Sequence, residues 1–266
     1  MDIQELRNQP HLSVSAINDY LDCSLSYKFG RIDGIAPEYT ATTLLFGSAI
    51  HKTLEEYHLA KMNKHTRTLE QLLRHFESQW MEIIQNTPDA QFKNGDNFDS
   101  LLEKGKILLT VYFQEYPKDN FKILGTEIPF SFQLPDVPIP IIGVMDLVEE
   151  DEGGNIIIVD HKTASRAYSK DDIDKCLQMT VYHMAAKRNG FEDREILLRL
   201  DCLIKTKTPK FEQYYTVRSE EDEQRAVKKI QQIWKSIEKE VFIPNDTSWK
   251  CSYCAFKNCC NEWFQG

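Results

Sequence analysis

The stretch that most constrains the fold of this chain is residues 141–163, IIGVMDLVEEDEGGNIIIVDHKT. Its two apolar runs, residues 141–148 and 156–159, are rich in Ile and Val, whose branched side chains favour strands. Residues 149–155 between them are charged and contain two adjacent glycines, which favour a turn. We therefore expect two antiparallel strands here, with the rest of the chain organised around them.

Three charged side chains stand near the ends of these two runs. Asp146 lies in the first run, Asp160 follows the second, and Lys162 comes two residues later. Because side chains alternate along a strand, Asp160 and Lys162 share one face and His161 points to the other. Carboxylates suit Mg²⁺ or Mn²⁺. An ammonium beside them can steer an attacking water or stabilise the charge of a phosphoryl transition state.

Composition limits the class of protein. The chain has 266 residues, 41% hydrophobic and 27% charged, with a formal net charge of −9. Such a chain is expected to be globular, and its charge gives no general attraction to nucleic acid, so a polyanionic partner needs a local basic groove or metal ions. No apolar run approaches the ~18 residues of a membrane span, and the N-terminus lacks the pattern of a signal peptide. We expect a cytoplasmic protein without a membrane partner.

Four of the seven cysteines lie within ten residues near the C-terminus, in CSYCAFKNCC. Cys251 and Cys254 have the C-x2-C spacing of paired metal ligands, and Cys260 offers a third thiolate, with Cys259 as its competitor. Disulfides are not expected in a reducing compartment. The spacing therefore indicates a metal site, and zinc and iron fit it equally well.

A fourth thiolate for this site must come from elsewhere in the chain. Cys23 is the candidate, because Cys176 is expected in a helix and Cys202 in a strand, where a cysteine is ordinarily buried as a small apolar side chain. The two ends of the chain are then brought together by metal.

The hydrophobic pattern predicts a helical first part followed by strands and helices. Helices are expected at about residues 13–29, 43–62, 68–86, 98–116, 169–190 and 220–240. Strands are expected at about residues 122–134, 195–205 and 211–217, in addition to the two runs of the hairpin. The expected fold class is α/β, with a central mixed sheet flanked by helices.

Two expected helices carry polar residues one turn apart, which places each pair on one helix face. Gly47 and His51 form the first pair, and the glycine allows a close approach to that face. Gln178 and Tyr182 form the second pair. Glu127, in the strand before the hairpin, is a further carboxylate expected near the metal ions.

Six pieces of the sequence together resemble a known family. They are SVSAINDYLDCSLSYKF, GSAIH, GVMDLV, IVDHKT, QMTVY and CSYCAFKNCC, in family order. With them the chain resembles the RecB-like branch of the PD-(D/E)xK nuclease superfamily, and within it the iron–sulfur nucleases typified by the AddB subunit and the CRISPR-associated Cas nucleases of the fourth family. The resemblance implies a restriction-endonuclease-like core and a single nuclease domain over residues 1–266. Within it, residues 1–117 form a mostly helical region, 118–240 the core, and 241–266 a cysteine segment that pairs with Cys23.

The resemblance also implies roles for individual residues. His51, Asp146 and Asp160 are implied to bind divalent metal, together with the main-chain carbonyl of His161, and Lys162 is implied to be the catalytic lysine. Gln178 and Tyr182 match the QxxxY motif, which organises the site and contacts the DNA strand. The implied ligands of a four-iron, four-sulfur cluster are Cys23, Cys251, Cys254 and Cys260. The chain departs from the family at Ser24, where proline is common, and at His161, where an aromatic residue is frequent.

The expected function is Mg²⁺- or Mn²⁺-dependent hydrolysis of DNA, as an exonuclease on single-stranded ends in recombination, repair or CRISPR spacer acquisition. No GxxxxGK[ST] phosphate loop occurs in the sequence, so a helicase or integrase partner would be a separate protein. The alternative is a non-catalytic DNA-end-binding or adaptor subunit, which has no need of Asp146, Asp160 and Lys162 together. A structural zinc protein explains the cysteines but leaves Gln178 and Tyr182 unexplained.

Overall fold

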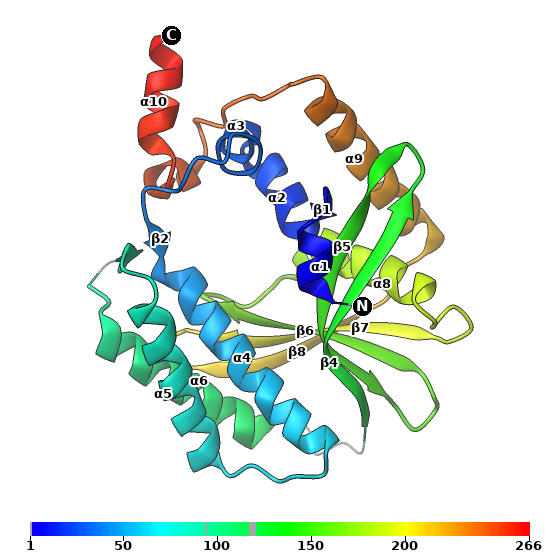
Figure 1. Cartoon of the computed structure of the whole chain (residues 1–266). Helices are drawn as coiled ribbons and strands as arrows, with labels where there is room; N and C mark the ends of the chain where they lie inside the picture. The colour runs from blue at the N-terminus through cyan, green and yellow to red at the C-terminus, as the bar shows by residue number, and fades with distance from the viewer. Residues whose placement is uncertain (1, 94, 117–120) are drawn as a thin grey trace. The chain divides into compact units, whose positions relative to one another are not determined.

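The computed structural model describes residues 2–93, 95–116 and 121–266 (Figure 1). The described residues divide by their contacts into two compact units. The first unit comprises Met1–Thr40, Ser131–Gly143 and Ser219–Gly266, and the second comprises Ala41–Phe130 and Val144–Arg218. The boundary expected after residue 117 lies outside the described residues, and the single nuclease domain stays a prediction.

Helices dominate the first part of the chain, and strands and helices follow one another after it. The helices are α1 Ile3–Arg7, α2 Val14–Asp22, α3 Ser24–Tyr27, α4 Thr42–Met62, α5 Leu69–Gln85, α6 Phe98–Glu115, α7 Lys170–Asp174, α8 Leu177–Arg188, α9 Glu220–Glu238 and α10 Lys257–Gln265. The strands are β1 Leu12–Ser13, β2 Thr40–Ala41, β3 Ala90–Gln91, β4 Lys122–Leu134, β5 Val137–Glu150, β6 Ile156–Ala164, β7 Ile196–Ile204 and β8 Lys210–Thr216.

The predicted hairpin is β5 and β6, which pair antiparallel with Leu147 opposite Val159. In the turn between them the side chain of Asp151 accepts the Asn155 N–H, and Gly154 adopts a positive φ of 82°. β6 then pairs parallel with β7, and β7 pairs antiparallel with β8. In the described chain β1 and β4 also pair with β5, which completes the mixed sheet that the sequence predicts.

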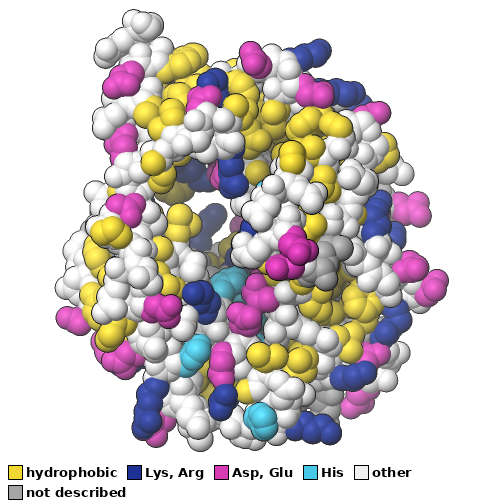
Figure 2. All heavy atoms as spheres, in the orientation of Figure 1, with side chains coloured by type: hydrophobic (Ala, Val, Ile, Leu, Met, Phe, Trp, Pro, Cys, Tyr) yellow, Lys and Arg dark blue, Asp and Glu magenta, His cyan; other side chains and the backbone are white. Residues whose placement is uncertain are grey.

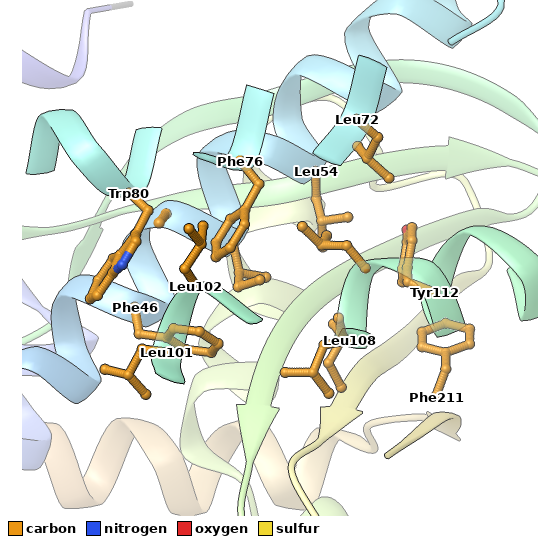
Figure 3. Packing of buried hydrophobic residues seen from close by; sticks show 14 of the residues in the cluster. Phe46, Leu54, Leu72, Phe76, Trp80, Leu101, Leu102, Leu108, Tyr112 and Phe211 are labelled. Atoms are coloured by element: carbon orange, nitrogen blue, oxygen red, sulfur yellow. The ribbon is translucent and has the colours of Figure 1, made fainter. Parts of the chain in front are cut away.

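Three long helices of the second unit cover one face of this sheet (Figure 1). They are α4, α5 and α6, and the side chains of Thr68 and Asn97 cap the last two through reciprocal bonds at their N-termini. Their buried side chains meet those of β7 and β8 in one apolar core (Figure 3). The core includes Phe46, Leu54, Leu72, Phe76, Trp80, Leu101, Leu102, Leu108, Tyr112 and Phe211. α8 packs against β7 from the opposite face, which also carries Asp160.

Gly105 of α6 lies directly under the ring of Phe76 in this core, so an added methyl group there would overlap the ring. We expect Gly105→Ala to destabilise the chain by up to about 2 kcal/mol. Overpacking a core costs about 1–3 kcal/mol, whereas the gain in helix propensity is only about 1 kcal/mol. Urea unfolding measures the difference. In a Phe76→Leu background the same change should no longer destabilise, and an equal loss in both backgrounds would contradict the packing explanation.

The first predicted helix is divided in the structure. One helix is expected over residues 13–29, but α2 ends at Asp22 and α3 begins at Ser24, because Cys23 between them has an extended backbone with φ −162° and ψ 105°. Within the first unit the Ser24 hydroxyl donates to the carbonyl of Ile243 and accepts its N–H, which holds the chain at this break.

The helix expected over residues 169–190 is also divided, into α7 and α8. Arg218, buried in the second unit, donates to the carbonyls of Ile173 and Cys176 at the division. In a continuous helix the Ile173 carbonyl would accept the N–H of Leu177, so its bond from Arg218 stabilises the interruption. Cys176 consequently precedes α8 and is only half-buried, whereas Cys202 is buried in β7 as expected. In the part of the chain that the structure describes, no helix combines the length and apolarity needed to cross a membrane.

Candidate active site

Asp160 and Lys162 form a close ion pair on the α8 face of β6. The carboxylate is 1% exposed, and Nζ of Lys162 lies 2.8 Å from its Oδ2. Burial alone would lower the pKa of Lys162, but the charge and hydrogen bond of Asp160, with the charge of Asp146, outweigh it and raise the pKa above its usual value. The ammonium therefore stays protonated at neutral pH.

The expected pair Gln178 and Tyr182 lies over this ion pair from α8. The amide oxygen of Gln178 accepts from Lys162 Nζ at 2.9 Å, and its Nε2 donates to Asp160 Oδ1 at 2.8 Å. The same Nε2 lies 2.7 Å from the hydroxyl of Tyr182, which in turn is 3.5 Å from Asp160 Oδ1. Burial and the nearby carboxylates hold the pKa of Tyr182 well above its usual value. One glutamine thus orients the lysine, the aspartate and the tyrosine together.

A second group of side chains can hold a cation. One ligand atom each from His51, Glu127 and Asp146 lies within 4.8 Å of the other two, and no other set of three His, Cys, Asp or Glu in the described residues meets this condition. Asp146 Oδ2 accepts the main-chain N–H of His161 at 2.8 Å and lies 3.3 Å from His51 Nδ1. The structure therefore brings the expected pair His51 and Asp146 together with Glu127.

The donor chemistry of this group fits a divalent cation. Burial, followed by the charge of Asp160, raises the pKa of Asp146 to about 6. The buried carboxylates of Asp146 and Asp160 repel each other, and a bound cation would relieve that repulsion. Glu127 adopts a left-handed backbone with φ 47°, an uncommon conformation for a residue with a side chain. Oxygen donors with one imidazole are suited to Mg²⁺ or Mn²⁺.

His161 has two different environments. Its main-chain N–H donates to Asp146 Oδ2, and its ring points to the opposite face of β6, as the strand alternation predicts, with Nδ1 3.7 Å from the same Asp146 oxygen. There the ring stacks on His58 with centroids 5.5 Å apart, and its Nε2 lies 3.5 Å from the hydroxyl of Tyr112. That hydroxyl is 2.6 Å from His58 Nε2. Burial lowers the pKa of His58 to about 3 and that of His161 well below its usual value, so both rings are neutral.

A buried ionic network lies beside these rings and was not expected from the sequence. Arg199 of β7 is 1% exposed and pairs with Asp201 at 2.8 Å and with Glu149 at 2.9 Å. The hydroxyl of Tyr116 donates to Glu149 and accepts from Arg199, and Gln213 donates to Asp201. The only signal in the sequence is the alternation of Arg and Asp inside an apolar strand, ILLRLDCLI.

Four cysteines meet around one cavity of the first unit, with a volume of about 150 Å³. They are Cys23, Cys251, Cys254 and Cys260, whereas Cys259 does not line the cavity. The aromatic rings of Phe29, Phe256 and Phe264 also line it. No three of these sulfurs satisfy the 4.8 Å spacing that the His51 group meets, among the residues described. A tetrahedral zinc site would need sulfurs about 3.8 Å apart, given Zn–S bonds of about 2.3 Å.

Solved structures are similar to this chain, whereas no curated protein matches it. The solved structure of a candidate exonuclease from Eubacterium rectale matches with a TM-score of 0.55 and 16% identity, over 93% of this chain and 89% of that one. At this identity the match shows the fold alone, a mixed sheet flanked by helices. The solved structure of SSO0001 matches over 91% and 92% of the two chains, with 14% identity and a TM-score of 0.38.

The sequence itself matches a family over most of its length. Residues 11–261 match the PD-(D/E)XK nuclease superfamily, and the matched region contains both the Asp160–Lys162 pair and the His51 group. Members of this superfamily are nucleases that use divalent metal ions, for which His51, Glu127 and Asp146 supply a possible site. The chain belongs to the PD-(D/E)XK nuclease superfamily.

Proposed function

We propose that the chain hydrolyses phosphodiester bonds of DNA in a reaction that depends on Mg²⁺ or Mn²⁺. The observation that carries this proposal is the ion pair of Asp160 and Lys162, fixed by Gln178 beside the carboxylate of Asp146. Membership in the nuclease superfamily supports it. A half-buried lysine that hydrogen bonds hold in one position is suited to stabilising the charge that develops in the transition state.

In the proposed reaction each side chain has one task. His51, Glu127, Asp146 and Asp160, with the His161 carbonyl, hold the divalent ions. When bound, these ions neutralise phosphate charge and make a bound water more acidic. Lys162 donates a hydrogen bond to the attacking water or to a phosphate oxygen, and its charge stabilises the extra negative charge of the transition state. Gln178 and Tyr182 keep the carboxylate of Asp160 and the ammonium in place.

The proposed substrate is a single-stranded DNA end, cleaved exonucleolytically. Figure 2 shows Lys and Arg side chains interspersed with Asp and Glu over the face in view, in keeping with the net charge of −9. Binding through general attraction is therefore weak, and the bound metal ions supply much of the local positive charge. The likeness to the Eubacterium rectale protein supports an exonuclease. The proposed setting is cytoplasmic, in recombination, repair or CRISPR spacer acquisition, with a separate helicase or integrase.

Digestion of labelled oligonucleotides tests this function. Single-stranded DNA, duplex DNA and RNA, each labelled at either end, are incubated with purified protein and Mn²⁺, and EDTA serves as the control. Mononucleotides or short fragments from single-stranded DNA, formed only with metal, are expected. Binding of DNA ends without cleavage under any metal would instead favour the alternative, a non-catalytic adaptor for a helicase or integrase.

We also propose that Cys23, Cys251, Cys254 and Cys260 bind a four-iron, four-sulfur cluster. All four thiols line one cavity, whereas Cys259 does not line it, which supports one shared group held by these four cysteines. Its proposed role is structural, since it would join α2 and α3 to the C-terminal segment within the first unit.

The cluster has a visible signature. Protein purified without oxygen should be brown and contain about four iron and four sulfide per chain. Cys23→Ser should lose most of the iron, whereas Cys259→Ser should keep it, because Cys259 lies outside the cavity lining. Colourless protein that contains zinc, or equal loss of iron in both variants, would contradict this assignment.

Glu127 gives a direct test of the cation site. Glu127→Gln removes one of its two carboxylate charges, so we expect the affinity for Mn²⁺ to fall by about 10–100-fold, the range typical of disturbed metal sites. Calorimetric titration of Mn²⁺ without DNA measures this change. Glu152→Gln, in the exposed turn between β5 and β6, is the matched control. Equal affinities for both variants would remove Glu127 from the site.

A further inference from the structure

Two tyrosines outside the proposed machinery lie on its face of the sheet. The strand register places Asp160 of β6 opposite Leu200 of β7, and Leu200 opposite Tyr214 of β8. Residues that are opposite one another in neighbouring strands project from the same face of a sheet. The side chain of Tyr214 therefore shares a face with Asp160, two strands away, which corresponds to about 10 Å.

Tyr168 packs against Tyr214. It belongs to the loop between β6 and α7, and its ring stands edge to face with that of Tyr214, with centroids 6.2 Å apart and an interplanar angle of 70°. Its phenol is close enough to feel the charges of Lys162 and Asp160. Tyr168 thus contacts Tyr214 and lies near the proposed catalytic lysine.

The pair is held rigidly from the strand side. The hydroxyl of Tyr214 donates to the carboxylate of Glu212 and accepts the main-chain N–H of Tyr168. Burial, followed by the hydrogen bond to Glu212, raises the pKa of Tyr214 to about 12, so the hydroxyl remains a donor. These two bonds fix the loop that carries Tyr168 to β8 and set the orientation of both rings.

Neither ring is used to fill the core. Both tyrosines are half-buried, in contrast to Tyr182, which is buried beneath α8 against Phe130. An aromatic ring that is fixed in direction, partly open to solvent and next to a phosphodiester-cleaving lysine offers a flat surface to whatever adjoins the phosphate. In DNA each phosphate is esterified to deoxyribose, and the flat apolar group that the sugar carries is the nucleobase.

We propose that Tyr168 stacks on the nucleobase next to the scissile phosphate and that Tyr214 fixes the ring of Tyr168 in the stacking position. This inference rests on the proposed nuclease function and names the part of the substrate that the site recognises. Stacking tolerates any base sequence, because every base has such a face. It also favours single strands. The bases of a duplex are already stacked on one another and must be unstacked before one of them can stack on a protein ring.

The test compares the cleavage of an oligonucleotide that has all its bases with that of one whose terminal residues lack them. One oligonucleotide is all thymidine, and a second lacks the bases of its three terminal residues at both ends while keeping the phosphates. The initial rate of the first cleavage with Mn²⁺ gives kcat/KM for each. We expect the wild-type chain to prefer the complete oligonucleotide by about tenfold. Tyr168→Ala should cleave both at the same low rate, and Tyr168→Phe, which keeps the ring, should behave like the wild type.

The outcomes separate this inference from the function on which it rests. If the wild type cleaves DNA but Tyr168→Ala loses activity equally on both oligonucleotides, the residue supports the loop and does not stack. Full activity of Tyr168→Ala on the complete oligonucleotide would also overturn the inference. A wild-type chain that cleaves neither oligonucleotide overturns the nuclease proposal itself. Urea unfolding of each variant confirms that the compared chains are folded.

Discussion

Replacing Lys162 by alanine should lower the rate of Mn²⁺-dependent DNA cleavage by at least about 10²–10³-fold, the usual effect of removing one fixed donor from a transition state. The ammonium is held by Asp160 and Gln178 within 3.1 Å, and no other lysine occupies that position in the described structure. The substitution also leaves the buried Asp160 without its cation, so we expect a loss of stability in addition, and urea unfolding of the variant checks that the compared chains are folded. Single-turnover cleavage of labelled single-stranded DNA measures the rate.

A matched lysine provides the control for this prediction. Lys175 is exposed at the end of α7 and pairs with Asp171, one turn away on the surface. Lys175→Ala removes the same charge from the same unit. We expect it to change the rate of DNA cleavage by less than about twofold, because exposed ion pairs contribute little. A Lys162→Ala chain that cleaves as fast as Lys175→Ala would refute the assigned role of Lys162.

Replacing Arg199 by methionine should cost about 3–5 kcal/mol of the free energy of unfolding. The change leaves Glu149 and Asp201 buried without the cation that both contact, and breaking a buried pair from one side has this magnitude. Since domains commonly have a total stability of about 5–15 kcal/mol, a loss of this size is severe. Urea unfolding followed by circular dichroism measures it.

Two further variants isolate the cause. Arg225→Met breaks an exposed pair with Glu221 on α9 and should cost less than about 1 kcal/mol. Adding Glu149→Gln and Asp201→Asn to Arg199→Met removes the uncompensated charges and should restore part of the lost stability. If the triple variant were less stable than Arg199→Met, packing of the arginine stem, and not its charge, would explain the loss.

Much of the candidate site follows from local patterns in the sequence. The hairpin, and the shared face of Asp160 and Lys162, depend only on strand alternation, and Gln178 with Tyr182 depends only on helix periodicity. These periodicities depend only on residues a few positions apart, so the sequence alone predicts which of these side chains share a face. The identity of the elements that face each other, such as α8 above β6, came from the family resemblance.

The remaining features depend on contacts between distant parts of the chain. The break between α7 and α8 is stabilised by Arg218, more than 40 positions away. The residues next to Cys176 do not predict this break. Tyr112 reaches His161 across 49 positions, and Tyr116 reaches Glu149 across 33. Such pairs are chosen by three-dimensional packing, which local propensity does not encode.

The alternation along β6 has a consequence for how this chain can change during evolution. One face of β6 carries Asp160 and Lys162, and the other carries the ring of His161. The insertion or deletion of a single residue within β6, before these three, would therefore exchange the two faces. The imidazole would then face Gln178, and the ion pair would enter the layer of aromatic rings around Tyr112. Length variation among descendants should therefore accumulate in the turn at residues 151–155, while the strand itself accepts substitutions but no change in length.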